Sequence, residues 1–200
     1  SSLRSLLENV NILHNRSVRP NLARVERSKQ RVEMAEAIFI PKIEAEANDR
    51  RSIFYLGGTY RDAGLFDKAI VWFERYFEVS NWPEERYEAA LLIADCYMHV
   101  GEVEKAKTIV SRELYQNPNR NEAFMFLGEM AVREGKNAGA IQWFKHASIV
   151  PMPIDPMFVQ IASHTWLPHF RLFETYAKLQ DNPKAAEHGR YAMDLDCPCQ

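Results

Sequence analysis

The sequence predicts an all-α fold, an α-α superhelix built of antiparallel helix pairs, and three observations lead to this prediction. Residues 53–82, 90–118 and 124–151 carry small, aromatic and glycine residues at matching places, and these stretches start 37 and then 34 residues apart. Alternating runs of β-branched residues, which are typical of strands, do not occur. The 200 residues are enough to bury a core without the help of a disulfide or a metal ion.

Each repeated stretch is expected to form a helix, a tight turn and a second helix. Gly64, Gly101 and Gly135 stand where the first helix ends, which suits the left-handed backbone of a C-cap. Gly57 and Gly128 are small residues at the point where the two helices cross. Apolar residues then recur in the second helices: Ala69, Ala106 and Ala140, followed by Phe73, Val110 and Phe144. A period of 34 with this pattern is typical of the tetratricopeptide repeat, whose units bury their apolar faces only by stacking.

Flanking segments extend this array at both ends. Residues 1–30 form a lead-in segment, and residues 31–150 hold a half unit followed by three full repeats. Prolines interrupt the period over residues 151–169, which we interpret as a bridge. Residues 170–200 are expected to form a degenerate fourth repeat or C-terminal cap, in which Asp181-Asn182-Pro183 takes the place of the turn glycine.

Composition excludes several classes of protein. The net charge of −2 argues against a generally basic nucleic-acid-binding protein. No apolar run reaches the roughly 18 residues that a membrane-spanning helix needs, and residues 1–20 lack the apolar block of a signal peptide. Three cysteines, an odd number, favour a reducing compartment, so we expect a cytoplasmic location. The arginine-rich residues 16–31 could serve as a nucleic-acid-binding arm, but pairing with acidic surfaces of the protein is the favoured interpretation.

The tetratricopeptide resemblance implies a candidate binding site. In such arrays the first helices of successive units line a groove, and fixed positions of each helix point into it. Carried over position by position, these are Arg51, Phe54, Arg61, Asp62, Glu88, Asp95, His99, Glu122, Glu129 and Arg133. The mixed charges suit a peptide better than a phosphate backbone, which favours uniform lysine and arginine. The alternative is that these side chains are solvated groups on a helix face without a binding role.

The sequence offers no convincing reaction chemistry. Asp194-Leu195-Asp196 is a carboxylate pair of the kind that holds a divalent cation on a sugar nucleotide, but it ends the last predicted helix instead of following a strand. Cys197, Cys199 and His188 could supply zinc ligands, although zinc sites usually show two separated ligand pairs. We therefore expect no catalytic residue, no metal site and no cofactor.

A narrower resemblance starts at residues 51–64, Arg-Ser-Ile-Phe-Tyr-Leu-Gly-Gly-Thr-Tyr-Arg-Asp-Ala-Gly, and continues through Trp72-Phe73, Trp82 and Tyr87. These residues resemble the tetratricopeptide tail that follows the catalytic domain in many bacterial and phage family 2 glycosyltransferases. The resemblance implies a parent enzyme that uses a nucleotide sugar and a divalent cation, with its catalytic domain upstream of Ser1. Residues 1–30 would then include the end of that domain.

These patterns together predict a non-catalytic scaffold. Its partners would be a protein or peptide, a glycan acceptor, or further copies of the chain in a homo-oligomer. Two alternatives remain open at this point: a glycosyltransferase whose catalytic domain lies upstream, and a stand-alone adaptor that binds a peptide.

Overall fold

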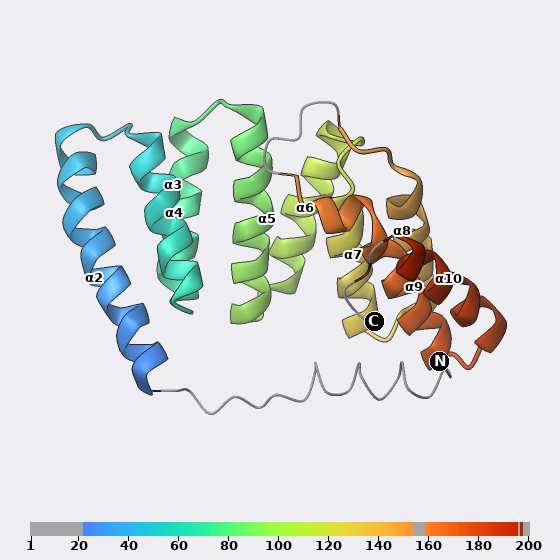
Figure 1. The fold of residues 1–200 in the computed structure, drawn as a ribbon. Coiled ribbons are helices and arrows are strands. Elements are labelled where there is room, and N and C mark those ends of the chain that lie inside the picture. Colours follow the sequence, from blue (N-terminus) through green and yellow to red (C-terminus); the bar gives the residue numbers. More distant parts are fainter. Residues whose placement is uncertain (1–21, 154–158, 196, 198–200) are drawn as a thin grey trace. The chain divides into compact units, whose positions relative to one another are not determined.

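The structure is a computed structural model, which describes residues 22–153, 159–195 and 197 (Figure 1). Every regular element in these ranges is a helix, which confirms the all-α prediction for the described part of the chain. The chain divides into two compact units, one with the described residues up to Glu113 and one with those from Leu114 onward. Each unit is described by itself.

The first unit consists of long helices joined by short turns (Figure 1). Helix α3 packs against both α2 and α4, and α4 also packs against α5. The elements are α2 (Leu22–Ala45), α3 (Arg50–Asp62), α4 (Phe66–Val79), α5 (Pro83–Val100) and α6 (Val103–Gln116), whose last turn passes into the second unit. Helix α2 continues through Pro41, although proline removes one backbone hydrogen bond from a helix interior.

The second unit pairs α7 with α8 and α9 with α10, and α8 also packs against α9. A short 3₁₀-helix, η1, lies against α7, α8 and α9. The elements are α7 (Glu122–Arg133), α8 (Asn137–Ile149), η1 (Ile161–His164), α9 (Trp166–Lys178) and α10 (Asn182–Asp194). Residues 159–169, the described end of the predicted bridge, are therefore an ordered part of this unit.

Glycine ends the first helix of three pairs, as the sequence predicts. The φ angles of Gly64, Gly101 and Gly135 are +76°, +86° and +74°, a left-handed conformation that glycine adopts without steric cost. The turn between α9 and α10 differs from the prediction, because Gln180 takes the left-handed conformation there, with φ of 61°. Asp181 instead caps α10, accepting a hydrogen bond from the backbone N–H of Lys184.

Small residues bring the helices of each pair close together, as expected. A Cβ atom placed on Gly57 would lie 3.1 Å from the ring of Phe73, and one on Gly128 would lie 2.4 Å from the ring of Phe144. Both phenylalanines are completely buried. The close crossing of α3 with α4, and of α7 with α8, thus depends on a glycine, which has no side chain, facing an aromatic ring.

A recurring polar contact, which the sequence analysis missed, fixes the register between neighbouring pairs. The Tyr60 hydroxyl on α3 donates to Glu36 on α2 at 2.6 Å, and the Tyr97 hydroxyl on α5 donates to Glu74 on α4 at 2.7 Å. Burial, followed by the carboxylate, raises the pKa of each tyrosine, so the phenols stay protonated as donors. A lysine eight residues later covers each ring: Lys68 over Tyr60 and Lys105 over Tyr97.

Candidate partner-binding surfaces

Helix α3 presents an exposed stripe in the first unit. Arg51, Tyr55, Gly58 and Asp62 follow one another at intervals of three or four residues and so lie on one helix face. Arg51, Tyr55 and Asp62 are exposed, whereas Ile53 on another face is completely buried. The stripe therefore carries a positive charge near one end of α3 and a negative charge at the other.

Two other predicted residues of α3 have mainly local roles. Phe54 is nearly buried, with its ring centroid 5.4 Å from that of Tyr76, so it belongs to the interface between α3 and α4. The Arg61 guanidinium donates to the neighbouring Asp62 carboxylate at 2.7 Å. A partner that contacts Asp62 would therefore meet this ion pair instead of a lone carboxylate.

Helix α5 carries a second stripe of predicted residues. Glu88, Asp95 and His99 are seven and four residues apart, which places them on one face, and they are half-buried or exposed. The His99 ring hydrogen-bonds the backbone carbonyl of Asp95 at 2.8 Å and stacks on the Phe66 ring at 4.1 Å between centroids. His99 is thus held in place by contacts within its own unit.

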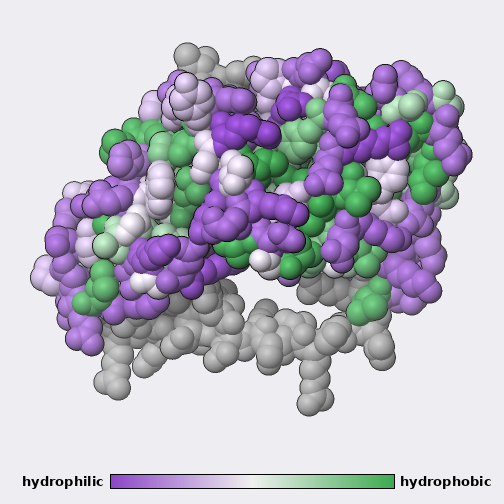
Figure 2. Space-filling view, turned by 180° about the vertical axis from the view of Figure 1, so that it is seen from behind, coloured by the Kyte–Doolittle hydropathy of each residue, from purple (hydrophilic) through white to green (hydrophobic). Residues whose placement is uncertain are grey.

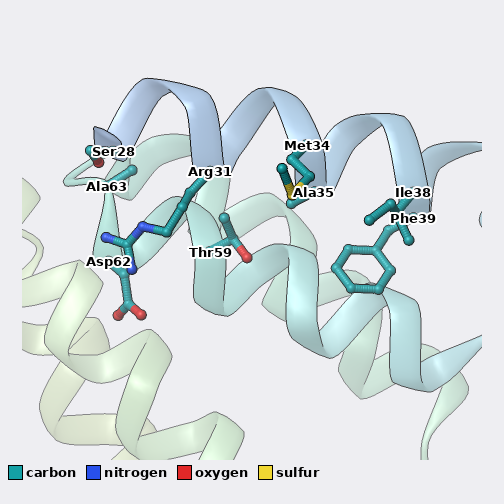
Figure 3. Close-up of a pocket in the computed structure, with 9 residues that line it drawn as sticks. All are labelled: Ser28, Arg31, Met34, Ala35, Ile38, Phe39, Thr59, Asp62 and Ala63. Carbon is teal, nitrogen blue, oxygen red and sulfur yellow. The ribbon is translucent and has the colours of Figure 1, made fainter. Parts of the chain in front are cut away.

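A cavity of about 230 Å³ opens between α2 and α3 (Figure 3). Arg31 and Asp62 lie at one end of it, Met34 lies in the middle, and Ile38 and Phe39 lie at the other end (Figure 3). Of its lining residues, the sequence analysis placed only Asp62 in the binding groove. The spacing of Arg31, Met34 and Ile38 puts them on one face of α2, but the cavity itself arises from the packing of α2 against α3.

One face of the molecule is mixed in character. Figure 2 shows hydrophilic residues over most of the face that it draws, with hydrophobic residues in small patches among them. Such a surface favours specific polar contacts supplemented by small apolar ones.

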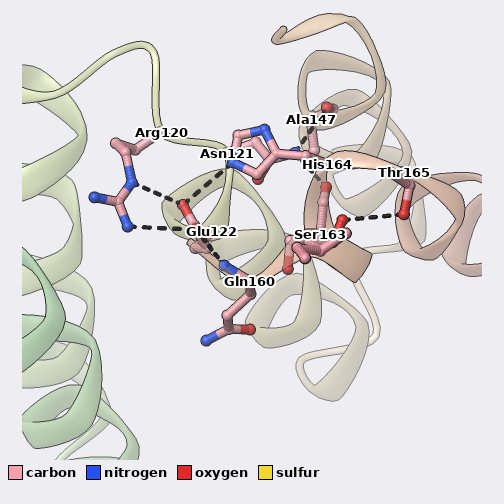
Figure 4. A network of polar contacts seen from close by, with 9 residues as sticks. Arg120, Asn121, Glu122, Ala147, Gln160, Ser163, His164 and Thr165 are labelled. Atoms are coloured by element: carbon pink, nitrogen blue, oxygen red, sulfur yellow. Dashed lines mark hydrogen bonds and ion pairs between the residues drawn. The ribbon is translucent and has the colours of Figure 1, made fainter. Parts of the chain in front are cut away.

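In the second unit, Glu122 lies in the interior, although the sequence analysis placed it in the groove (Figure 4). Its carboxylate accepts a hydrogen bond from the backbone N–H of Gln160 at 3.0 Å and pairs with Arg120 at 3.3 Å. The Nε2 atom of His164, whose side chain is fully buried, lies 3.6 Å from the same carboxylate. Glu122 is covered because residues 159–164 fold back over the start of α7.

Asn121, next to Glu122, holds the same segment from a second side (Figure 4). Its side chain is completely buried and donates to the backbone carbonyls of Ala147 and Ser163. These bonds join the beginning of α7 to the end of α8 and to η1. This network holds residues 159–164 against α7 and α8, and the sequence spacing predicts none of its contacts.

Glu129 and Arg133, the remaining predicted residues, lie on α7. Glu129 forms an ion pair with Arg171 of α9, which also pairs with Glu174 at 2.7 Å. Burial raises the pKa of Glu129, and the Arg171 guanidinium opposes this shift. Arg133 is exposed near the end of the helix. Arg171 is the residue that the sequence analysis missed here, and it already satisfies Glu129.

No protein-family model and no curated protein matches this sequence. Solved structures are nevertheless similar to it. The crystal structure of MamA has a TM-score of 0.64 at 18% identity, over 90% of this chain and 96% of that chain. The C-terminal part of a TPR repeat-containing protein from Cytophaga hutchinsonii has a TM-score of 0.64 at 17% identity, over 86% of this chain and 64% of that chain. YrrB, described as a TPR protein with an unusual peptide-binding site, has a TM-score of 0.58 at 17% identity, over 96% of this chain and 91% of that chain.

This chain has the tetratricopeptide-repeat fold. Helices α3, α5, α7 and α9 are then the first helices of their pairs, and α4, α6, α8 and α10 are the second ones. The predicted binding residues all lie on first helices. Those from Arg51 to Asp62 are on α3, those from Glu88 to His99 are on α5, and those from Glu122 to Arg133 are on α7. Their role in binding stays a prediction.

The last tetratricopeptide-like pair contains two histidines in direct contact. The Nδ1 atoms of His169 on α9 and His188 on α10 are 3.1 Å apart, so one neutral imidazole donates to the other. The His188 ring also stacks on the Tyr176 ring, with an interplanar angle of 4°. Burial lowers the pKa of both histidines, and for His188 the nearby His169 and Lys145 lower it further while Glu187 opposes this shift.

We expect the second unit to lose stability in acid because of this pair. Since the folded pKa values lie below the ordinary value of 6.5, the unfolded chain binds more protons. The stabilisation is complete above about pH 6.5 and is lost as the pH falls below it. The substitution His188→Phe, which retains a stacking ring, should reduce this loss in thermal melts between pH 7 and 5. His164, whose pKa is also lowered first by burial, accounts for part of the remaining loss.

The matched control is His146→Gln, which alters an exposed histidine on α8. This variant should retain the full acid dependence of the wild-type chain. An unchanged dependence in His188→Phe would contradict the role assigned to the histidine pair.

The described residues contain no obvious site for chemistry. Burial, followed by the charge of Asp95, raises the pKa of the Cys96 thiol to about 12, so this cysteine is a poor nucleophile. In residues 22–153, 159–195 and 197, no three histidine, cysteine, aspartate or glutamate side chains come together as metal ligands would. Asp196 and Cys199 lie outside the described residues. None of the described helices is long and apolar enough to cross a membrane.

Proposed function

We propose that the chain is a non-catalytic scaffold that binds a segment of a protein partner along α3 and α5. Gly58 is the observation that carries this proposal. It lies in the middle of α3, within the exposed stripe, and a Cβ atom placed there would meet nothing within 4 Å. A glycine in a helix interior costs about 1 kcal/mol relative to alanine, and packing does not explain this one. A helix surface that lacks a side chain lets the backbone of another chain approach closely.

The charges around Gly58 suggest the chemistry of the partner. Arg51 and Asp62 are 11 residues apart in sequence, which corresponds to about 16 Å along the helix. An extended peptide of about five residues covers this length. The proposed ligand is therefore a short extended peptide with an acidic residue near Arg51 and a basic residue near the Arg61–Asp62 pair. The peptide-binding site named for YrrB is consistent with this use of the fold.

Selection of random 12-residue peptides on the full chain tests this proposal. Peptides that bind should lose affinity about tenfold or more on Arg51→Glu, because a charge-assisted contact becomes a repulsion. The control Arg190→Glu changes an exposed arginine on α10 in the second unit and should leave the affinity unchanged. Recovery of no binding peptide, or equal binding by Arg51→Glu, would argue against the proposed surface.

Gly58→Ala separates stability from binding. The substitution should raise the free energy of unfolding by about 0.5–1 kcal/mol, since it strengthens the helix without a clash. It should also weaken the selected peptides, because a methyl group then stands where their backbone approaches. Gly139→Ala on α8 is the matched control, since a Cβ atom there also meets nothing within 4 Å. That variant should gain stability and keep its peptide affinity.

A narrower version of the proposal treats the chain as the tail of a family 2 glycosyltransferase. The resemblance over residues 51–64 supports it. In that case the surface of α3 and α5 would bind a glycan acceptor or a partner of the parent enzyme. We expect residues 1–200 alone to transfer no sugar from nucleotide-sugar donors, and transfer by this chain alone would contradict the scaffold proposal.

A further inference from the structure

The face of α2 that borders the cavity carries large apolar side chains that are exposed to solvent. Met34 is 64% exposed and Ile38 is 46% exposed, and Arg31 lies on the same face one turn earlier. Tyr55 of α3 is 51% exposed and stacks on Phe39 of α2. Met34 and Ile38 form an apolar strip along one side of α2, beside the cavity (Figure 3).

The repeat geometry indicates that another helix belongs on this strip. Glu36 of α2 and Glu74 of α4 each accept a hydrogen bond from a tyrosine of the next first helix, so α2 corresponds to α4 with an offset of 38 residues. In α4, Phe73 and Tyr76 pack on Phe54 of α3, the first helix of that pair.

The equivalent positions in α2 are Ala35 and Ile38, which line the cavity. Helices α4, α8 and α10 each have an antiparallel first helix, whereas the described part of the chain provides none for α2. A helix that ran antiparallel to α2 would therefore complete the pair.

The charges on α2 identify a suitable occupant. Residues 25–31 contain three basic residues and one acidic residue, for a net charge of +2. Residues 41–47, around the other end of the helix, contain two acidic residues and one basic residue, for a net charge of −1. A second α2 in antiparallel orientation places each positive end against a negative end. It also places Met34 opposite Ile38 of the other copy, around a twofold axis near Glu36.

We propose that two copies of the chain form a twofold-symmetric dimer in which α2 of each copy takes the place of the first helix for α2 of the other. Such an interface is isologous, since the same strip serves both copies. With the axis near Glu36, residues 27–45 of the two α2 helices overlap, which gives a contact length of about 28 Å. Asp62 belongs both to this cavity and to the proposed peptide surface, but the two proposals are tested separately, since the readout here is mass and not peptide affinity.

The mass of the full chain in solution tests the proposal directly. Light scattering after gel filtration at about 50 µM should give 46.4 kDa, twice the 23.2 kDa of one chain. Ile38→Glu should give a monomer with unchanged helicity, because it places a charge at the centre of the interface. The control Val71→Glu changes a residue of α4 that is 62% exposed and should leave the dimer intact. A monomeric wild-type chain, or a dimeric Ile38→Glu variant, would overturn the proposal.

A charge exchange tests the antiparallel orientation. In this orientation Glu44 of one copy faces residue 28 of the other and lies beside Arg31. Arg31→Glu alone and Glu44→Arg alone should each raise the dissociation constant about three- to fivefold. The double variant should restore the wild-type value, because the opposite charges meet again with their signs exchanged. A double variant weaker than both single ones would overturn the antiparallel arrangement.

Discussion

Replacing Gly128 by alanine is expected to lower the free energy of unfolding of the second unit by about 2 kcal/mol. The new Cβ atom would lie 2.4 Å from the Phe144 ring, which is completely buried between α7 and α8. Alanine stabilises a helix by about 1 kcal/mol relative to glycine. The clash with Phe144 must therefore cost more than this gain in helix propensity for the variant to be less stable. Urea denaturation followed by circular dichroism measures the change.

Gly139→Ala serves as control in the same pair of helices. The Cβ atom at this position meets nothing, so only the gain in helix propensity remains and the variant should be slightly more stable than the wild type. A Gly128→Ala variant as stable as Gly139→Ala would show that α7 and α8 do not cross as closely as described.

Glu122→Ala is expected to destabilise the second unit by about 3 kcal/mol. The carboxylate is almost completely buried and faces Arg120, His164 and the backbone N–H of Gln160. Removal of one partner from a buried ionic network costs more than the loss of a surface pair, since the remaining polar groups lose their compensation. Thermal melts should show the loss, and limited proteolysis should cut the chain next to Gln160 faster because Gln160 loses its anchor.

Two further variants separate charge from hydrogen bonding in this network. Glu122→Gln retains an oxygen that can accept from Gln160 and should lose less stability than Glu122→Ala. Glu104→Ala removes a carboxylate that is 85% exposed on α6 and should change the melting temperature little. Equal melting temperatures for the two alanine variants would contradict the role of Glu122 in holding residues 159–164 against α7.

The exposure of the candidate residues could be predicted from sequence in part. Arg51, Asp62, Asp95 and Arg133 are on accessible helix faces, as a rule based on repeat positions suggests. Phe54 follows the same rule, yet it is nearly buried. The rule gives the direction of a side chain around its helix axis, whereas burial depends on which residues of other elements cover it.

The sequence alone determined the helix pairs and their turns. Glycine at positions 64, 101 and 135 is needed for a left-handed backbone, and Gly57 and Gly128 are needed for close crossings, so these requirements are local and visible in the spacing. Only the tertiary structure decided that Glu122 and Asn121 hold the bridge and that α2 exposes Met34 and Ile38 beside a cavity. These features depend on contacts between residues 24 to 42 positions apart, which arise when helices pack and which no local pattern encodes.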